Sequence, residues 1–556
     1  MNRNQFKLLQ AILVVLFFPF VHMFGQNYVE NGLTYKVIWD SVSLELMAYQ
    51  PSAFSGDMRL LHIPSTVVHQ EKTYKVKRVG SNAFYGLQGI EAIVVDDGIE
   101  IIGNYAFESC INLKSVYIPA SVRVIGEGIF GSCYNLKEIV VDSLNENFES
   151  PEGSNAIIAD DELVAACPNA RIPSSVTIID DYAFYHCNTM EQIVIPEGVE
   201  KIGFGAFQGC SSLKRITLPE SLKRIGPDAF HGCTSLDSVF IPKNVSEILG
   251  ANIFAGCYRL TSIVVDKDNT VFDSRNDCNG IVRKEDSTLI ASCATTTIGE
   301  DIKALDNDCF KDVILHTIRI PKSIEKLSGA PFFGCFEIDS LFVDPDNAFY
   351  VSPQGANAIL TRDGKTLVVG CRSTEIPADV ETIDDYAFVG RYTKPMLKLP
   401  EGLKKVGTSA FSGCNMMIEL IIPSSVEDIS SSAFSDCYNL NVVQVLSPIE
   451  KINYGTFSNC SSLSVLSLPE GLKQIDNLAF KNCVSLKNVH LPSTIELVKD
   501  DAFNGCTSLK YVHLPSTIGV VERNTFYICK QLTDVVMQAG HTKIDKYAFV
   551  GCDALK

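Results

Sequence analysis

None of the short motifs that mark common catalytic sites occurs in this sequence. There is no nucleophile elbow, no phosphate-binding loop, no HExxH zinc motif and no CxxC pair, so the enzyme classes built on these motifs have no site here. The nine histidines are scattered, and none has an acidic and a nucleophilic neighbour that sets it apart. We therefore expect a protein that is not an enzyme and that needs no cofactor.

Positive charge is also scarce. Lys and Arg number 47 against 65 Asp and Glu, which gives a net charge of –18. Nucleic-acid binding needs a basic surface, so we expect no nucleic-acid partner. The chain has one tryptophan and no linker or low-complexity tract, but its 46% of apolar residues is enough for a folded protein.

The sequence has no apolar run of membrane-spanning length near its start. The run from Ala11 to Phe24 is shorter than the roughly 20 residues of a spanning helix, and Arg3 and Lys7 precede it. This pattern predicts a signal peptide over residues 1–25, with an uncleaved membrane anchor as the alternative. We expect an exported protein, secreted or at the cell surface (the periplasm is also open), with no stable membrane span once the signal is removed.

What the sequence does contain is a repeat of 23 residues, which is clearest in its last third. Phenylalanines mark the register, and a cysteine follows three residues after each of the last seven. The register residues are Phe388, Phe411, Phe434, Phe457, Phe480, Phe503, Phe526 and Phe549. A fixed period of this length is the signature of a solenoid, because one such unit cannot bury its apolar face alone.

One complete repeat runs from Cys460 to Asn482 and reads CSSLSVLSLPEGLKQIDNLAFKN. The alternation at Leu466, Ser467 and Leu468 predicts a short strand, which the following proline ends because it has no N–H to donate. The apolar residues after the proline form a second wall of the coil, and the Ala-Phe pair closes it. Stacking such coils places phenylalanine over phenylalanine and cysteine over cysteine.

The pattern L-x-x-h-x-h-P-x-x-h-x-x-h-x-x-x-A-F-x-x-C resembles the BspA-type leucine-rich repeat of bacterial and protozoan surface proteins, over roughly residues 60 to 552. The resemblance implies a β-rich solenoid, a right-handed superhelix of about 20 coils with one parallel sheet and short turns or helical segments elsewhere. It also implies adhesin-like binding to host matrix proteins, other microbes or glycans. A shared fold does not by itself fix that function.

The 19 cysteines have two interpretations. Most of them occupy one repeat position, where a buried thiol packs as a small hydrophobic side chain. Disulfide bridges between adjacent coils are the alternative, although parallel side chains give a poor dihedral angle for them.

We divide the chain into an N-terminal cap region over 26–80 and a solenoid over 81–556. Three longer intervals near 141–183, 265–309 and 343–387 resemble one another and predict a variant coil with an added hairpin. Each begins with a cluster of Asp and Asn side chains, such as Asp266, Asp268 and Asn269. These residues are either turn formers or oxygen ligands for calcium, and the spacing lacks the glycine and the final glutamate of an EF-hand.

The best functional candidate is an extended surface formed by the outward positions of the strands. Solenoid curvature exposes such a surface for binding, and aromatic residues and arginine are typical interface anchors. The residues that we expect to contribute are Tyr117, Phe240, Arg319, Phe342, His490, Tyr511 and His513. The alternative is that they are ordinary strand-forming residues on an open sheet. His490 and His513 stand one period apart, and a metal site there would need a third ligand, so we expect no metal.

The sequence therefore predicts a secreted or cell-surface repeat protein that is not an enzyme and that binds a protein or glycan on a host or microbial surface. A structural envelope scaffold without a specific external ligand is the first alternative. A glycan-handling enzyme with carboxylates assembled from the variant coils is the second.

Overall fold

The computed structural model shows a β-solenoid of about 20 turns with parallel sheets, which confirms the predicted fold class. It divides into two compact units, Met1–Ala229 and Phe230–Lys556, which are described separately. The predicted signal peptide, 1–25, lies outside the described residues. The structure describes residues 27–30, 33–37, 43–49, 59–250, 252–537 and 543–556.

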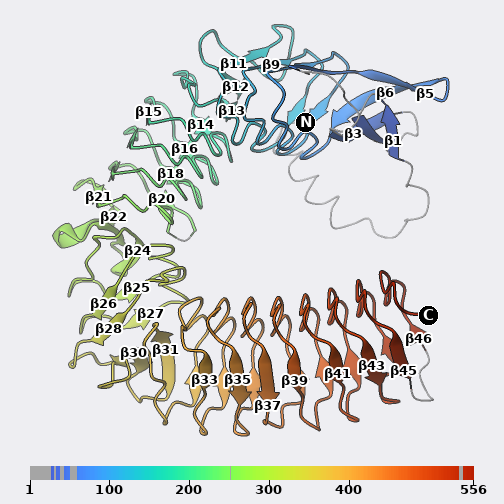
Figure 1. Cartoon of the computed structure of the whole chain (residues 1–556). Helices are drawn as coiled ribbons and strands as arrows, with labels where there is room; N and C mark the ends of the chain where they lie inside the picture. The colour runs from blue at the N-terminus through green and yellow to red at the C-terminus, as the bar shows by residue number, and fades with distance from the viewer. Residues whose placement is uncertain (1–26, 31–32, 38–42, 50–58, 251, 538–542) are drawn as a thin grey trace. The chain divides into compact units, whose positions relative to one another are not determined.

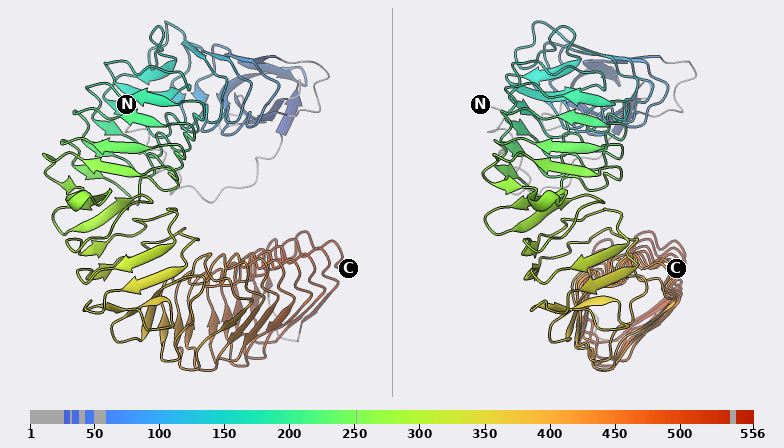
Figure 2. Two further views of the ribbon diagram at one scale, coloured as in Figure 1. Left: turned by 60° about the vertical axis from the view of Figure 1, so that its left-hand side comes forward. Right: turned by 90° about the vertical axis from the view of Figure 1, so that its left-hand side faces the viewer.

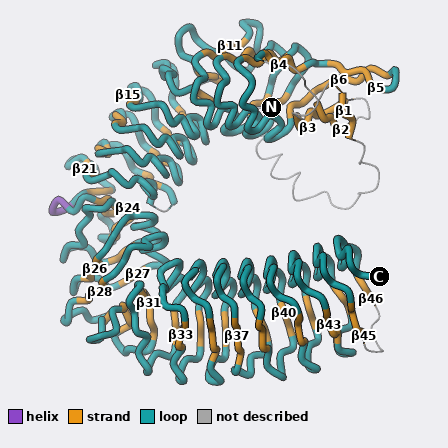
Figure 3. Tube along the Cα trace, viewed as in Figure 1, coloured by secondary structure: helices purple, strands orange, loops and turns teal. Residues whose placement is uncertain are grey.

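Each coil contains a main strand of three or four residues, with turns and loops around it (Figure 3). In the first unit the main strands are β4 (Leu60–Ile63), β7 (Ala92–Val95), β9 (Ser115–Ile118), β11 (Glu138–Val141), β15 (Gln192–Val194) and β17 (Arg215–Thr217). In the second unit they are β19 (Ser238–Ile241), β21 (Ser262–Val265), β26 (Thr317–Ile320), β28 (Ser340–Val343), β33 (Met396–Lys398), β35 (Glu419–Ile422), β37 (Val442–Val445), β39 (Val465–Ser467), β41 (Asn488–His490), β43 (Tyr511–Leu514) and β45 (Asp534–Met537). Paired neighbours in this line are parallel.

A second line of parallel strands corrects the expectation of a single sheet. Its strands are two residues long, too short for alternation to reveal them in the sequence. In the first unit they are β8 (Ile101–Ile102), β10 (Val124–Ile125), β14 (Ile178–Ile179), β16 (Lys201–Ile202) and β18 (Arg224–Ile225). In the second unit they are β20 (Glu247–Ile248), β25 (Ala304–Leu305), β27 (Lys326–Leu327), β32 (Thr382–Ile383), β34 (Lys405–Val406), β36 (Asp428–Ile429), β38 (Lys451–Ile452), β40 (Gln474–Ile475), β42 (Leu497–Val498), β44 (Val520–Val521) and β46 (Lys543–Ile544).

Helix is nearly absent from the described residues. One 3-10 turn, η2 (Arg275–Asp277), is the helical segment there, so the expected helical segments elsewhere are turns instead. In the part of the chain that the structure describes, no helix has the length and apolar character needed to cross a membrane.

The first strands of the chain are mostly antiparallel, unlike the coils. They are β1 (Asn27–Glu30), β2 (Leu33–Val37), β3 (Ser43–Tyr49), β5 (Thr66–His69) and β6 (Lys72–Val79). β1, β2 and β3 pair in antiparallel order, and β5 pairs with β6 in the same way. β6 then pairs in parallel with β8, which joins these strands to the second line of the solenoid. This arrangement leads the chain into its first coil.

Each long interval contains an antiparallel hairpin. The hairpins are β12 (Ala156–Ala159) with β13 (Glu162–Ala166), β23 (Gly280–Arg283) with β24 (Thr288–Ser292), and β30 (Ala358–Thr361) with β31 (Thr366–Gly370). Short strands β22 (Phe272–Asp273) and β29 (Tyr350–Val351) precede the last two. The second strand of each hairpin pairs in parallel with the next short strand of the second line. The hairpin strands are largely buried, so the hairpins are part of the wall of the solenoid.

The core of residues 388–549, which we call the regular array, is a stack of phenylalanine rings. Neighbouring rings have centroids 4.8 to 5.7 Å apart and are nearly parallel. Figure 2 (right) shows the coils of this region one behind another. Stacking of like on like, which the 23-residue period predicts, therefore holds throughout this stretch.

The cysteines stack beside the phenylalanines as buried free thiols. In the regular array each thiol donates to the backbone carbonyl of the phenylalanine one coil earlier, for example Cys460 to Phe434 at 3.2 Å and Cys483 to Phe457 at 3.3 Å. A small apolar side chain with a weak donor therefore satisfies an acceptor that lies inside the coil. Of the two interpretations of the cysteines, the structure shows the buried thiols.

The phenylalanine stack stops at each hairpin, since a hairpin replaces the Ala-Phe turn of a coil. After the third hairpin the usual cysteine is replaced by Arg391, which is almost fully buried. Its guanidinium donates to the carbonyl of Phe332, 59 residues earlier, at 3.1 Å, and to the carbonyls of Tyr386 and Ala387. Because the preceding turn, with Pro331 and Phe332, lies on the far side of the hairpin coil, only a long side chain reaches its carbonyl.

Candidate binding face

The outward side of the main strands follows from their alternation. In β19, Val239 and Ile241 are buried in the core, whereas Ser238 and Phe240 point outward and are exposed. The strands pair in register, so outward residues of neighbouring coils lie side by side. The seven predicted residues all stand on this outward side.

The best-defined contact on the face joins two of the predicted residues. Arg319 of β26 is the register partner of Phe342 of β28 (both strands are labelled in Figure 1). The Arg319 guanidinium lies 4.8 Å from the centroid of the Phe342 ring, which is 46% exposed. An arginine held over an aromatic ring is a preorganised pair of the kind found at interface centres.

Phe240 belongs to a separate apolar patch of the second unit. Its register partner is Val264 of β21, and both side chains are exposed. The sequence prediction named the phenylalanine and missed the valine, because it considered only aromatic and basic anchors. Other apolar residues at outward positions are exposed as well, namely Leu60, Val194, Met396, Val465 and Val536.

Three more predicted residues meet on two neighbouring strands. His490 of β41 is the register partner of His513 of β43, and Tyr511 lies on the same side of β43, two residues before His513. The next residues along this row are Ser467 and Val536, which supply no imidazole or carboxylate. Within the described residues, no group of three or more His, Cys, Asp or Glu is placed to hold a metal ion. The arrangement is that of a polar aromatic surface.

Tyr117 is the predicted residue that lies in the first unit. Its hydroxyl donates to the carboxylate of Asp142, which directly follows the neighbouring strand β11. This hydrogen bond raises the pKa of Tyr117 and lowers the pKa of Asp142. Val94 and Val140 flank the ring in register, so this part of the face is an apolar row with one fixed polar edge.

The Asp and Asn clusters of the long intervals form turns. The carboxylate of Asp266 accepts from the backbone N–H of Asp268, and the equivalent bond joins Asp346 to Asp344. Asn269 is fully buried, and its amide donates to two backbone carbonyls one coil earlier, at 3.0 and 2.9 Å. Its oxygen accepts from two backbone N–H groups. The turn-forming interpretation of these residues is therefore confirmed.

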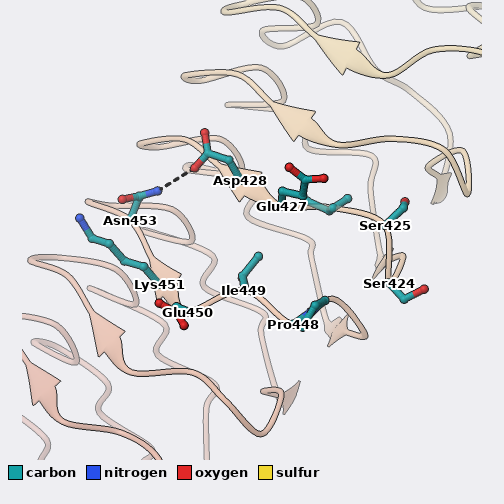
Figure 4. A pocket seen from close by; sticks show the side chains of 10 residues that line it. Ser424, Ser425, Glu427, Asp428, Pro448, Ile449, Glu450, Lys451 and Asn453 are labelled. Atoms are coloured by element: carbon teal, nitrogen blue, oxygen red, sulfur yellow. Dashed lines mark hydrogen bonds between the residues drawn. The ribbon is translucent and has the colours of Figure 1, made fainter.

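A hollow between two coils of the regular array lies apart from the face (Figure 4). It opens where β36 and β38 do not pair, and the Asn453 amide there points to the Asp428 carboxylate at 3.4 Å. Pro448 stands one period after Ser425. The Ser425 hydroxyl donates to the backbone carbonyl of the preceding coil, and the proline has no hydroxyl to make the equivalent bond. None of the seven predicted residues lines the hollow.

Comparison with protein families decides what this array is. A model of the BspA type leucine rich repeat region, in six copies, matches residues 65–152, 165–278, 290–352, 369–484 and 450–556. The chain belongs to the BspA-type leucine-rich-repeat family. This confirms the family predicted from the repeat pattern.

Several solved structures align with nearly the whole chain at low identity. A leucine rich cell surface protein from Faecalibacterium prausnitzii A2-165 is 20% identical, with 93% of this chain and 95% of that chain covered and a TM-score of 0.35. A leucine-rich repeat protein from Bacteroides ovatus ATCC 8483 is 21% identical, with 93% and 100% covered and a TM-score of 0.29. The pneumococcal vaccine antigen PcpA is 16% identical, with 94% and 99% covered and a TM-score of 0.33. At these values none of the three is evidence for what this chain binds. None of the curated proteins matches the chain.

Proposed function

We propose that this protein is exported, resides at the cell surface or is secreted, and binds another macromolecule without catalysing a reaction. Its ligand is a protein or a glycan on a host or microbial surface. The single observation behind this proposal is the preformed Arg319–Phe342 pair, exposed on the outward side of adjacent strands.

The chemistry of the face supports a macromolecular ligand rather than a small molecule. Its residues form rows along successive coils of the main strands, whereas a small-molecule site is concave and encloses its ligand. Exposed aromatic rings next to a fixed arginine supply large contact area at low entropic cost. Membership of the BspA-type family agrees with a repeat protein that recognises a partner.

The proposal is tested by binding of the chain without its proposed signal peptide, residues 26–556, to an array of matrix proteins, mucins and glycans. A second protein carries Tyr117→Ser, Phe240→Ser, Phe342→Ser and Tyr511→Ser. We expect a ligand that the parent binds and that the variant binds more than about tenfold more weakly, as interface aromatics typically contribute.

The matched control changes four exposed tyrosines outside the main strands. Tyr134→Ser, Tyr258→Ser, Tyr438→Ser and Tyr454→Ser also remove four aromatic rings, all of them exposed, and we expect binding within about twofold of the parent. Equal losses of affinity in both variants would refute the assignment of the binding site to this face. If the parent binds none of these matrix proteins, mucins and glycans, the result favours the envelope-scaffold alternative. Fractionation of the protein with the cell envelope then tests that alternative.

A further inference from the structure

A second surface of the first unit has a chemistry of its own, on a different edge of the coils. Four aromatic rings meet in the turns that follow the short strands β8, β14 and β16: Tyr105, Tyr182, Tyr185 and Phe204. The three tyrosine centroids are 5.2 to 6.0 Å apart, each pair edge to face. We call these four residues the tyrosine cluster. The three tyrosines are half-buried.

Glycines of the neighbouring turns make room for these rings. A Cβ atom at Gly128 would lie 2.6 Å from the Tyr105 ring, and one at Gly131 would lie 2.6 Å from the Tyr185 ring. Gly128 has a φ of +58°, a conformation that favours glycine independently of space. Tyr105 and Tyr185 therefore lie against the two glycines of this turn, which have no side chain in the way of the rings.

Where a hairpin interrupts the turns of this edge, fewer rings contact one another at the third hairpin than at the first. The first hairpin removes one Ala-Phe turn from this edge, and the third hairpin does the same in the second unit. There, one edge-to-face pair, Phe333 with Tyr386 at 6.2 Å, spans the gap, and the Phe336 ring lies over Gly390. The tyrosine cluster has four edge-to-face contacts where the third hairpin has one, so its rings contact one another far more extensively.

Two carboxylates accompany the rings. Glu127 adjoins Tyr105, whose backbone N–H donates to the Glu127 carbonyl at 2.9 Å. Burial, Tyr182 and Glu127 together raise the pKa of Tyr105 to about 12. Burial alone raises the pKa of Glu108, and within the described residues no cationic side chain pairs with it. The surface therefore combines aromatic rings with one partly desolvated carboxylate, that of Glu108.

We propose that the tyrosine cluster, with Glu108 and Glu127, binds an arginine side chain of a partner protein. Guanidinium stacks on aromatic rings and pairs with carboxylates, and it loses less hydration than an ammonium group. An apolar partner would leave Glu108 buried without a counterion, and an anionic partner would be repelled. This inference does not rest on the face of the main strands.

The test is calorimetric titration of residues 26–556 with hexa-arginine and with hexa-citrulline, which has the same shape without the charge. We expect hexa-arginine to bind and hexa-citrulline to bind at least about tenfold more weakly. The variant Glu108→Gln/Glu127→Gln keeps every ring and should lose about tenfold in affinity. Equal binding of the two peptides, or no binding of hexa-arginine, would overturn the proposal.

The control Glu146→Gln/Glu152→Gln removes the same charge from exposed positions in the first hairpin interval and should change affinity by less than about twofold. A loss as large as that of Glu108→Gln/Glu127→Gln would mean that net charge alone attracts the peptide, which contradicts the site. Tyr185→Phe should bind like the parent, whereas Tyr185→Leu should weaken binding several-fold. If Tyr185→Leu does not fold, the glutamine variants and the citrulline comparison still decide the question.

Discussion

The regular array and the hairpin coil at 343–387 belong to the same unit but are stabilised in different ways. In the regular array every coil repeats the same side chains, so phenylalanine rings and thiols form unbroken rows. In the hairpin coil the Ala-Phe turn is absent, and a fully buried asparagine, Asn347, connects the chain to the coil before it. The regular array is therefore stabilised by repeated apolar stacking, whereas the hairpin coil combines buried apolar strands with a fixed polar network around Asn347.

The largest expected effect is the removal of one ring from the middle of the stack. Phe457 is fully buried and stacked on both sides, at 5.7 and 5.5 Å. Phe457→Ala should lower the free energy of unfolding by about 3–5 kcal/mol, because it removes buried area and leaves a cavity. Urea unfolding followed by circular dichroism measures it. A loss below about 1 kcal/mol would show that the stack does not stabilise the array.

Asn347 provides the corresponding test in the hairpin coil. Its side chain makes four hydrogen bonds with backbone groups, from 2.7 to 2.9 Å. Asn347→Ala should lower the free energy of unfolding by about 2–4 kcal/mol, since buried donors and acceptors lose their partners. The control Asn439→Ala removes an exposed amide with one such bond and should cost less than about 1 kcal/mol. Equal losses would contradict the special role of the buried amide.

Alkaline pH should weaken the regular array. Burial raises the pKa of the Cys460 and Cys506 thiols to about 12, from 9.0. Above about pH 9 the unfolded chain loses these protons while the folded chain keeps them, so stability falls as the pH rises from about 9 towards 12. Urea midpoints at about pH 7 and pH 10.5 measure the fall. Cys460→Ala should make it shallower, and an unchanged slope would contradict the assignment.

The smallest effect concerns an ion pair on the regular array. Burial raises the pKa of Asp476, but hydrogen bonds from Lys451 and Lys499 outweigh it and bring the pKa to about 2. Asp476→Asn should cost about 1 kcal/mol near neutral pH, and the difference should vanish as the pH falls through about 2. Glu450→Gln breaks an exposed pair with Lys473 and should leave stability unchanged. A pH-independent cost for Asp476→Asn would exclude the charge as its cause.

The period and the main strands could be predicted from the sequence, because phenylalanine, cysteine and proline recur at fixed intervals. The second line of strands could not, since two residues such as Gln474–Ile475 are too few to show alternation. The exchange of a cysteine for Arg391 was visible, but not the guanidinium's reach across a hairpin coil. Such contacts depend on which coils the hairpin separates, and the repeat does not contain that information.

The candidate face was predicted more completely than the tyrosine cluster. Outward positions follow from alternation within one strand, so all seven predicted residues lie on the outward side. Tyr105 and Tyr185 are 80 residues apart and meet because a hairpin coil omits its turn between them. Their contact is a consequence of the interruption, and the 23-residue period gives no sign of it.

The central claim, that coils stack like on like around buried thiols, is tested most directly by counting reactive cysteines. The native protein without its proposed signal peptide is treated with an aromatic disulfide reagent near neutral pH, and again after denaturation without reductant. The structure predicts almost no rapid reaction in the native protein, and reaction of all 19 thiols once it is unfolded. Rapid reaction of many native thiols, or a denatured count well below 19 because bridges have formed, would contradict the stacked-thiol arrangement.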